Sequence, residues 1–220
     1  MESGSETQVI VIAEAPVPGL VKTGLTPPLR PEEAALVAEA ALADTLDVVA
    51  ATPTARRVIA LAGAPGAWLP GGFEVFGQRG GGPDERLAAA FADAYAAVPL
   101  PMVLIGTDTP QVTAAMISDA VASLESGEAD AVFGPATNGG FWLLGLRRPD
   151  RSLLAGVPMS EPDAGRVLLE RLAGDGLRVA LAPRLTAAGT FDAAEQVARE
   201  IRSSRFAAVF AASASGLSAA

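Results

Sequence analysis

Short runs of apolar residues recur along the chain and alternate with longer segments that have helical patterns. Two of the short runs, residues 9–13 and 102–105, are apolar at every position. Such runs suit strands that are buried on both faces, as in a parallel sheet covered by helices on each side. The sequence therefore predicts an α/β fold with three layers, α/β/α, around a mainly parallel, Rossmann-like mixed sheet.

The alternation continues over most of the chain without an internal repeat or an interdomain linker. The expected strands are 9–13, 58–61, 73–76, 102–105, 130–133, 141–146 and 177–181, and the expected helices are 31–51, 84–98, 113–124, 162–172 and one that begins at 192. We expect a single domain over residues 8–205, a disordered N-terminus at 1–7, and a C-terminal helix or tail at 206–220 that frays into disorder.

The composition excludes several kinds of chemistry. The chain has no histidine and no cysteine, which excludes a Ser-His-Asp triad, a histidine-ligated metal and a thiol nucleophile. Its formal net charge of −9 disfavours nucleic acid as a partner, because phosphate backbones are bound by basic surfaces. No apolar run approaches the ~20 residues of a membrane span, and the N-terminus is unlike a signal peptide. We expect a soluble, cytoplasmic protein; the pattern does not indicate its oligomeric state.

An aspartate follows the most apolar strand. Gly106 ends the run 102–105, and Asp108 stands where the chain leaves the sheet, just ahead of Pro110. Ligands of open α/β sheets bind at the carboxyl ends of the strands. A carboxylate there can hold Mg²⁺ or Mn²⁺, and that cation can carry a diphosphate. The alternative is that Asp108 caps the helix that follows Pro110.

The loop after the first strand, residues 14–28, is long for an α/β unit, whose loops are usually ~2–6 residues. Lys22 and Thr23 supply a cation and a hydroxyl, while Gly19 and Gly24 permit a phosphate to approach the backbone. The loop has neither the spacing of a P-loop nor a dinucleotide fingerprint. The alternative is a turn shaped by prolines and glycines, with Lys22 in solvent.

A second glycine-rich loop, residues 78–83, leads into a helix. Asp84 suits a helix cap better than a catalytic role. Arg79 and Arg86 could each face a phosphate or carboxylate of a ligand. Arg79 is the stronger candidate, because it precedes the glycines and is not within the helix.

A third loop turns the chain at Asn138-Gly139-Gly140. The glycines could let an acceptor lie on the backbone while Trp142 stacks on it. The alternative is a hairpin-like turn with Phe141 and Trp142 in the core. Further along, Asp163 could serve as a base on the acceptor side, although a capping role suits it better.

Four of these segments, in this order and spacing, resemble the bacterial DUF2064 group of glycosyltransferase-A-like proteins, also labelled selenium- or radical-SAM-associated transferases. The family pattern reads A-K-A-P-x-x-G-x-V-K-T-R-L at the first loop, then Q-x-G-x-x-x-x-E-R-L, G-x-D-x-P, G-P-x-x-D-G-G-[FY]-[WY] and a late D-x-D-T. The resemblance extends over most of residues 8–200. The matching residues include Ala15, Pro16, Gly19, Val21, Lys22, Thr23, Gln78, Glu85, Arg86, Leu87, Gly106, Asp108, Pro110, Gly134, Pro135, Gly139, Gly140, Phe141 and Trp142.

The resemblance implies a nucleotide-diphospho-sugar transferase fold, with a nucleotide or nucleotide sugar over the first loop and a divalent metal, Mg²⁺ or Mn²⁺, at Asp108. Asp108 is then the expected catalytic and metal-binding residue. Together with the reasoning from the loops, the expected nucleotide- and phosphate-binding residues are Ala15, Pro16, Gly19, Lys22, Thr23, Gln78 and Arg79. The expected acceptor-side residues are Asn138, Gly139, Gly140, Trp142 and Asp163.

Four departures from the family pattern concern the same chemistry. Glu14 replaces a lysine, Gly24 an arginine, Asn138 an aspartate and Gly189 a late aspartate. At these positions the chain therefore lacks cations that could bind phosphates. It also lacks carboxylates that could hold a metal. Restoring Lys at position 14, Arg at 24 and Asp at 189 is expected to raise the affinity for a metal–nucleotide complex.

Two functions follow from the matches and the departures. The first is a metal-dependent transfer of a glycosyl or nucleotidyl group from a nucleotide donor to an acceptor. The alternative is a catalytically impaired relative that binds a ligand or partner on the same scaffold. An unrelated dinucleotide-dependent oxidoreductase has little support, because the glycine fingerprint is absent.

Overall fold

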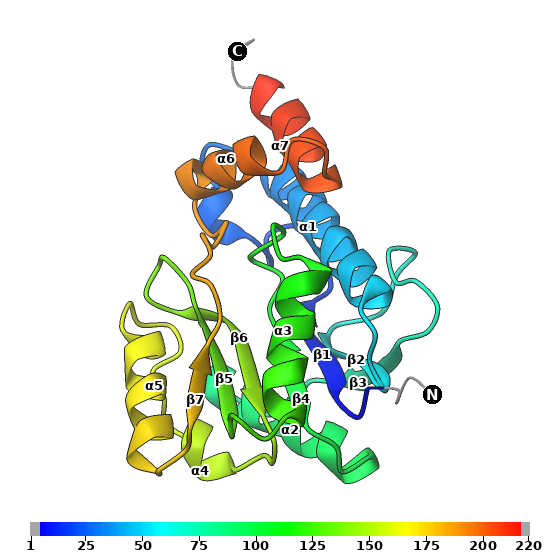
Figure 1. Cartoon of the computed structure of the whole chain (residues 1–220). Helices are drawn as coiled ribbons and strands as arrows, with labels where there is room; N and C mark the ends of the chain where they lie inside the picture. The colour runs from blue at the N-terminus through cyan, green and yellow to red at the C-terminus, as the bar shows by residue number, and fades with distance from the viewer. Residues whose placement is uncertain (1–4, 217–220) are drawn as a thin grey trace.

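The computed structural model describes residues 5–216, and within them seven strands form one mixed sheet (Figure 1). The order of the strands is β3-β2-β1-β4-β6-β5-β7. Their bounds are β1 (Gln8–Glu14), β2 (Arg56–Ala62), β3 (Glu74–Gly77), β4 (Met102–Ile105), β5 (Ala131–Pro135), β6 (Phe141–Leu146) and β7 (Val179–Leu181). Strands β3, β2, β1 and β4 are parallel, and β6 runs antiparallel between β4 and β5. The mixed α/β fold confirms the predicted fold class.

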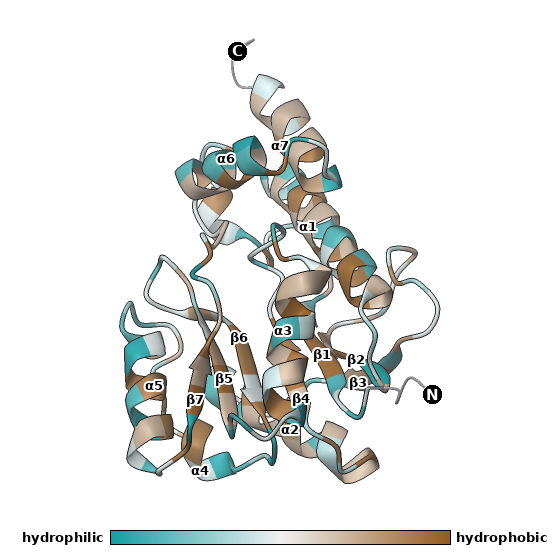
Figure 2. Cartoon of the chain, viewed as in Figure 1, coloured by the Kyte–Doolittle hydropathy of each residue, from teal (hydrophilic) through white to brown (hydrophobic). Residues whose placement is uncertain are grey.

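Helices cover both faces of this sheet. They are α1 (Pro31–Ala51), α2 (Pro83–Ala97), α3 (Ala114–Glu125), α4 (Arg151–Leu154), α5 (Ala164–Gly174), α6 (Phe191–Glu200) and α7 (Arg205–Ser215). Helices α1 and α3 pack on one face, and α2, α4 and α5 pack on the other. The strands at the centre of the sheet are hydrophobic along most of their length (Figure 2). No helix of the described part is long and apolar enough to cross a membrane.

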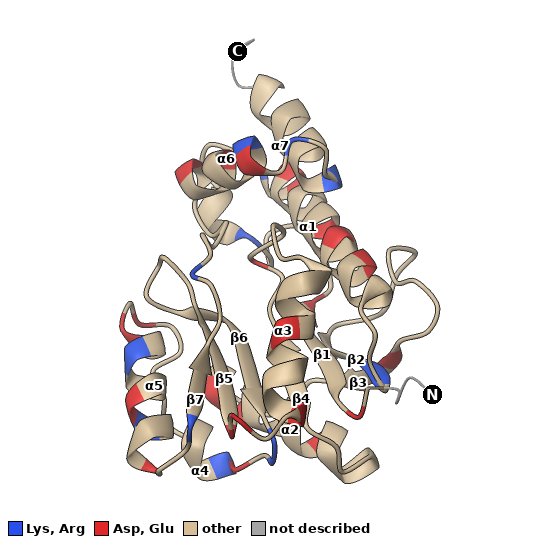
Figure 3. Cartoon of the chain, viewed as in Figure 1, with Lys and Arg blue, Asp and Glu red and all other residues tan. Residues whose placement is uncertain are grey.

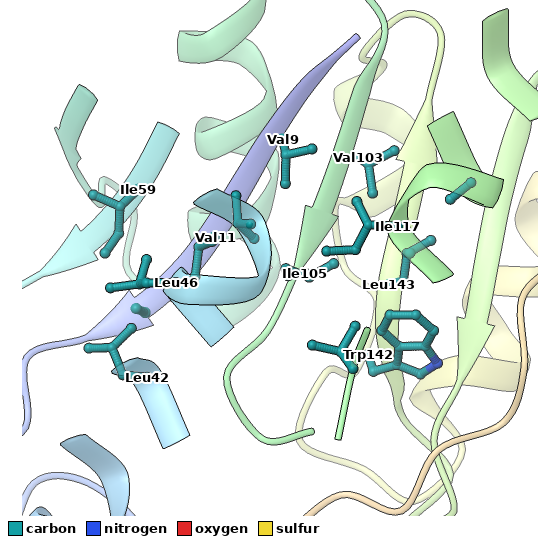
Figure 4. Close-up of a cluster of buried hydrophobic side chains, with 14 of the residues drawn as sticks. Val9, Val11, Leu42, Leu46, Ile59, Val103, Ile105, Ile117, Trp142 and Leu143 are labelled. Carbon is teal, nitrogen blue, oxygen red and sulfur yellow. The ribbon is translucent and has the colours of Figure 1, made fainter. Parts of the chain in front are cut away.

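The face under α1 and α3 shows why the central strands are apolar throughout. Val11 of β1 and Ile105 of β4 are fully buried against Leu46 of α1 and Ile117 of α3 (Figure 4). Neighbouring positions of the same strands, such as Leu104, contribute to the core on the opposite face. Because side chains alternate between the two faces of a strand, both faces require apolar residues here.

Helices α6 and α7 extend the molecule beyond the sheet; α7 packs on α1, and α6 packs on α7 (Figure 1). Helix α1 has acidic residues and no basic ones (Figure 3). Asp44 of α1 accepts hydrogen bonds from the N–H groups of Arg205 and Phe206 at the start of α7. The Arg205 guanidinium also lies 2.6 Å from Asp47 Oδ2. These contacts anchor the C-terminal helix on α1.

The expected elements are present, with ends shifted by only one or two residues. Helix α4 and the short 3₁₀ turn η1 (Thr23–Leu25) were not expected. Helix α7 occupies most of the predicted tail, while residues 1–4 and 217–220 of the predicted termini lie outside the described residues. The single-domain boundaries stay a prediction.

We expect Asp130 to make the stability of the protein sensitive to acid. Arg178 donates hydrogen bonds to this carboxylate and lowers the pKa of Asp130 from 3.8 to about 2. A pKa that is lower in the folded state adds stability above pH ~4, and that contribution is lost as the pH falls through about 2. In the variant Asp130→Asn, the free energy of unfolding should fall less steeply over this range than in the wild type.

Urea denaturation at several pH values between about 5 and 2 measures this difference. The matched control is Asp119→Asn, which removes an exposed carboxylate from α3. Equal slopes for the wild type and Asp130→Asn would contradict the assignment.

Candidate functional site

Two cavities lie at the edge of the sheet where β1 and β4 end, and both are lined by Ile12, Pro83, Gly106 and Asp108. The first-loop cavity, about 370 Å³, lies between the loop after β1, helix α1 and the start of α2. The turn cavity, about 340 Å³, lies between the β5–β6 turn, the start of α2 and the segment that leads into α5. Ligands of α/β sheets bind at this edge. The shared residues make the two cavities one cleft, with Asp108 at the junction.

Asp108 is paired with Lys22 at this junction. Lys22 Nζ lies 2.6 Å from Asp108 Oδ1 and donates a second hydrogen bond to the carbonyl oxygen of Ala188 at 2.9 Å. The Ala188 N–H donates to the backbone oxygen of Asp108 at 2.7 Å. The three residues form a closed hydrogen-bonded ring. Two of the residues predicted from the sequence are therefore in direct contact.

Two departures from the family pattern, Gly24 and Gly189, lie against each other beside this ring. A Cβ on Gly24 would lie 2.2 Å from the carbonyl oxygen of Gly189, whereas a Cβ on Gly189 would enter open space. Only glycine at position 24 permits this approach of η1 to residues 187–190. The gain in affinity expected from the triple substitution stays a prediction, but a side chain at position 24 would require this backbone to move.

The other predicted residues of the first loop shape it and do not line the cleft. The Ala15 N–H donates to the Ala62 carbonyl, which continues the pairing beyond β1. Gly19 has a φ of 79° and turns the exposed part of the loop. Pro16 and Thr23 are also outside the lining of both cavities, and Thr23 is exposed in η1.

Gln78 lines the first-loop cavity and bridges two strands. Its side-chain amide donates to the carbonyl oxygens of Ala13 at 2.8 Å and Ala60 at 3.0 Å. These bonds satisfy carbonyl groups at the ends of β1 and β2, so Gln78 has a structural role at the edge of the cavity.

Arg86, and not Arg79, is the arginine that lines the cleft. Arg79 lies outside the linings of both cavities and is ion-paired with Asp93 of α2. Arg86 Nη1 lies 3.8 Å from Glu14 Oε1, and Glu14 lines the same cavity. The structure does not support the preference for Arg79, because Arg86 on the first turns of α2 is directed toward the sheet edge, while Arg79 in the loop before it is not.

Asp84 does not cap α2, contrary to the expectation. The N-cap residue is Gly82, and Pro83 is the first residue of the helix. Asp84 Oδ2 accepts a hydrogen bond from the Gly156 N–H at 2.8 Å, which lowers the pKa of Asp84 below its usual range. The carboxylate ties the start of α2 to the loop after α4.

The β5–β6 turn forms one wall of the turn cavity. Asn138 and Gly140 line the cavity, and Asn138 Oδ1 accepts a hydrogen bond from the Gly140 N–H at 3.1 Å. Gly139 has a φ of 84°, and a Cβ there would lie 1.6 Å from the carbonyl oxygen of Pro162. The turn therefore requires glycine at position 139 to pack against the segment before α5.

Trp142 belongs to the core. Its side chain is among the buried residues of β1, β4 and β6, and the residue is 2% exposed (Figure 4). The indole Nε1 donates to the carbonyl oxygen of Pro183 at 2.9 Å. Although Trp142 contributes to the lining of the turn cavity, its ring has no open face on which an acceptor could stack. The burial of Trp142 agrees with the hairpin alternative and does not support stacking, while Phe141 is half-buried and lines the turn cavity.

Asp163 lies outside both cavities. It occupies the N-cap position of α5 without a side-chain cap and is paired with Arg166, 2.6 Å from Oδ2 to Nη2. The carboxylate lines a separate cavity with Arg166 and Arg184. The structure does not bring Asp163 to Asp108, which argues against its role as a base.

Thr109 is a residue of the cleft that the sequence analysis missed. It lines the turn cavity, is 2% exposed, and its hydroxyl is buried without a hydrogen-bond partner among the described residues. A buried hydroxyl of this kind is costly unless it finds a partner. In the sequence, the position of Thr109 directly after Asp108 was the signal that could have identified it as a residue of the cleft.

The donor set at the junction does not fit a resident divalent metal. Among residues 5–216, no group of three or more carboxylates is placed to hold a metal ion. Mg²⁺ in phosphate-binding sites usually has one or two carboxylates plus substrate phosphates. Here the single carboxylate at the junction, Asp108, is already paired with an ammonium, and Glu14 is close to Arg86.

We expect Gly24→Ala to destabilise the protein, because its methyl group would meet the Gly189 carbonyl. Forced packing of this kind usually costs about 1–3 kcal/mol. The measurement is the free energy of unfolding by urea. Gly189→Ala is the matched control, since its methyl group enters open space on the other side of the same contact. Equal stabilities of the two variants would show that the close approach is not maintained in solution.

The fold is shared with solved structures of low sequence identity. A protein from Desulfovibrio desulfuricans G20, described as a proposed nucleotide-diphospho-sugar transferase, matches with a TM-score of 0.87 at 23% identity over 97% of each chain. CMP:2-keto-3-deoxy-manno-octonic acid synthetase, complexed with CTP, matches with a TM-score of 0.57 at 11% identity, over 90% of this chain and 99% of that one. Rv0371c from Mycobacterium tuberculosis H37Rv, in complex with manganese, matches with a TM-score of 0.54 at 19% identity, over 89% of this chain and 98% of that one.

No curated protein matches the chain in sequence. A family model described as "Uncharacterized protein conserved in bacteria (DUF2064)" matches residues 36–161, more than half of the chain. The matched part contains Gln78, Arg86, Asp108 and the β5–β6 turn, while Lys22 and Gly189 lie outside it. The match confirms the resemblance found in the sequence: the chain belongs to the DUF2064 family.

Proposed function

We propose that this protein transfers a glycosyl or nucleotidyl group from a nucleotide donor to an acceptor. The observation that carries the proposal is the cleft itself, in which two cavities meet at one carboxylate, Asp108. A transferase must hold a donor and an acceptor next to each other. The two cavities adjoin, and one is lined by cations while the other has mainly apolar walls.

The first-loop cavity suits the phosphates of the donor. It is lined by two cations, Lys22 and Arg86, and by the backbone of the loop after β1. Ammonium and guanidinium groups bind phosphate oxygens by charge-assisted hydrogen bonds. The proposal is supported by the shared fold, because one solved relative of that fold is complexed with CTP.

The turn cavity suits an acceptor. Leu104, Phe141 and Met159 give it apolar walls, while Asn138 and Thr109 are polar residues of its lining. Small-molecule sites generally combine apolar walls with a few polar groups that fix the orientation of the ligand.

The chemistry of either transfer places negative charge on the departing group. A nucleotidyl transfer releases pyrophosphate, and a glycosyl transfer releases a nucleoside diphosphate. Lys22 and Arg86 would neutralise that charge as the bond breaks, which is an electrostatic contribution to the transition state. Asp108 would hold the Lys22 ammonium at the junction.

A second candidate is ligand binding without turnover. It is favoured by the position of Glu14, whose carboxylate lies 3.8 Å from Arg86 within the first-loop cavity. An anion there opposes a bound phosphate and partly neutralises the arginine.

The experiment is calorimetry with a panel of nucleoside triphosphates and nucleotide sugars, each with and without Mg²⁺ or Mn²⁺. We expect one nucleotide to bind, and Arg86→Met to weaken that binding about 10-fold or more, as expected for one charge-assisted contact. Phosphorus NMR of the bound donor, with a deproteinised bacterial metabolite extract as the source of acceptors, then shows whether the donor is consumed. Consumption that is lost in Asp108→Asn supports a transferase; binding without consumption supports the second candidate. No binding by any member of the panel would contradict both.

We also expect Glu14→Gln to raise the affinity for the same nucleotide. The substitution keeps the size of the side chain and removes the charge next to Arg86. Exposed ion pairs are usually worth less than about 1 kcal/mol, so the gain should be about 2- to 5-fold. Glu128→Gln, at the opposite edge of the sheet, is the control for a change in net charge. A gain of the same size in both variants would show that Glu14 acts only through long-range charge.

A further inference from the structure

Lys22 is the only lysine in the 220-residue chain; the other cationic side chains are arginines. Its side chain is 7% exposed, and the residue adopts a left-handed backbone conformation with a φ of 48°. Among the described residues, it is the one non-glycine residue with a positive φ. Such a conformation is uncommon for a residue with a Cβ. A buried ammonium on a strained backbone is a costly arrangement, and this points to a function for the position.

The ammonium is coordinated by oxygen atoms from two segments. Asp108 Oδ1 belongs to the loop after β4, and the Ala188 carbonyl oxygen belongs to the segment before α6. The hydrogen bond from the Ala188 N–H to the Asp108 backbone oxygen fixes these two acceptors relative to each other. The close contact of Gly24 with Gly189 places the first loop next to the same segment.

A carboxylate oxygen and a backbone carbonyl oxygen are the ligands that a hard divalent cation also uses. In this structure the Lys22 ammonium holds both of them. A divalent ion at the same oxygens would lie within a few ångströms of the ammonium, and like charges at such distances repel strongly. The site therefore favours its own cation over a metal ion.

We propose that the Lys22 ammonium is the resident cation of the cleft and binds a diphosphate group without a divalent metal. The inference rests on the proposed function, because it concerns the phosphates of the same donor. It adds that Asp108 acts through Lys22 as a positioning residue and is not a metal ligand.

The first test uses inorganic pyrophosphate as the probe in calorimetry with EDTA and, separately, with excess Mg²⁺. We expect pyrophosphate to bind in EDTA, with an affinity within about 3-fold of that in Mg²⁺. Lys22→Met should weaken binding in EDTA about 10- to 100-fold, and Lys22→Arg, which keeps the charge, should retain part of it. Arg148→Met, which removes an exposed cation outside the cleft, is the matched control.

A second test uses Mn²⁺ alone, followed by its electron paramagnetic resonance signal. We expect the wild type to show no Mn²⁺ binding that depends on Asp108, so that wild type and Asp108→Asn give the same titration. Pyrophosphate binding that requires Mg²⁺, or tight Mn²⁺ binding lost in Asp108→Asn, would overturn the inference and leave the proposed function intact. Failure of pyrophosphate and of the whole nucleotide panel, with and without metal, would overturn both.

A third measurement is made on the wild-type protein, and a variant serves only to assign the signal. Reductive methylation with ¹³C-formaldehyde labels Lys22 and the N-terminal amine of the wild-type protein and keeps both positively charged. We expect pyrophosphate in EDTA to shift the Lys22 methyl signal, which is identified by its absence from Lys22→Arg. An unshifted Lys22 signal at saturating pyrophosphate would contradict direct contact.

Discussion

The ion pair between Lys22 and Asp108 connects parts of the chain that are far apart in sequence. It joins the loop after β1 to the loop after β4, and the Ala188 carbonyl adds the segment before α6. The carboxyl edge of a parallel sheet is open by default, because strands end there and loops diverge. In this protein the ring of hydrogen bonds around Lys22 holds the first loop over that edge. The two cavities share the residue at its centre, so the shape of the cleft depends on this contact.

Most of the fold could be predicted from local patterns. The strand at 102–105 and the helix at 31–51 have the bounds expected from the sequence. A continuous apolar run is a strong local signal for a buried strand, and an Ala- and Leu-rich segment that begins with proline is one for a helix. Helix α4 was missed, since one turn of helix has no recognisable period. The order of the strands depends on contacts distant in sequence, and the sequence pattern did not predict it.

The candidate site was predictable in outline but not in detail. The spacing of the motifs predicted that one edge of the sheet holds Lys22, Gln78, Asp108 and the β5–β6 turn. It could not show that Arg79 pairs with Asp93 while Arg86 faces the cleft, because the direction of a side chain depends on where the helix begins. It also could not show that Gly24 meets Gly189, a contact between residues at opposite ends of the chain. In the sequence, both glycines stand where the family pattern has a cation or a carboxylate. In the structure, Gly24 permits the close packing beside Lys22, whereas a Cβ on Gly189 would enter open space.

A crystal structure of the protein with the nucleotide selected by calorimetry, grown with a chelator, tests the account most directly. The account predicts phosphate oxygens within hydrogen-bonding distance of Lys22 Nζ and the Arg86 guanidinium, with the transferred group directed past Asp108 toward the β5–β6 turn. A nucleotide bound elsewhere, such as the cavity lined by Arg147 and Arg148 at the opposite edge of the sheet, would contradict it.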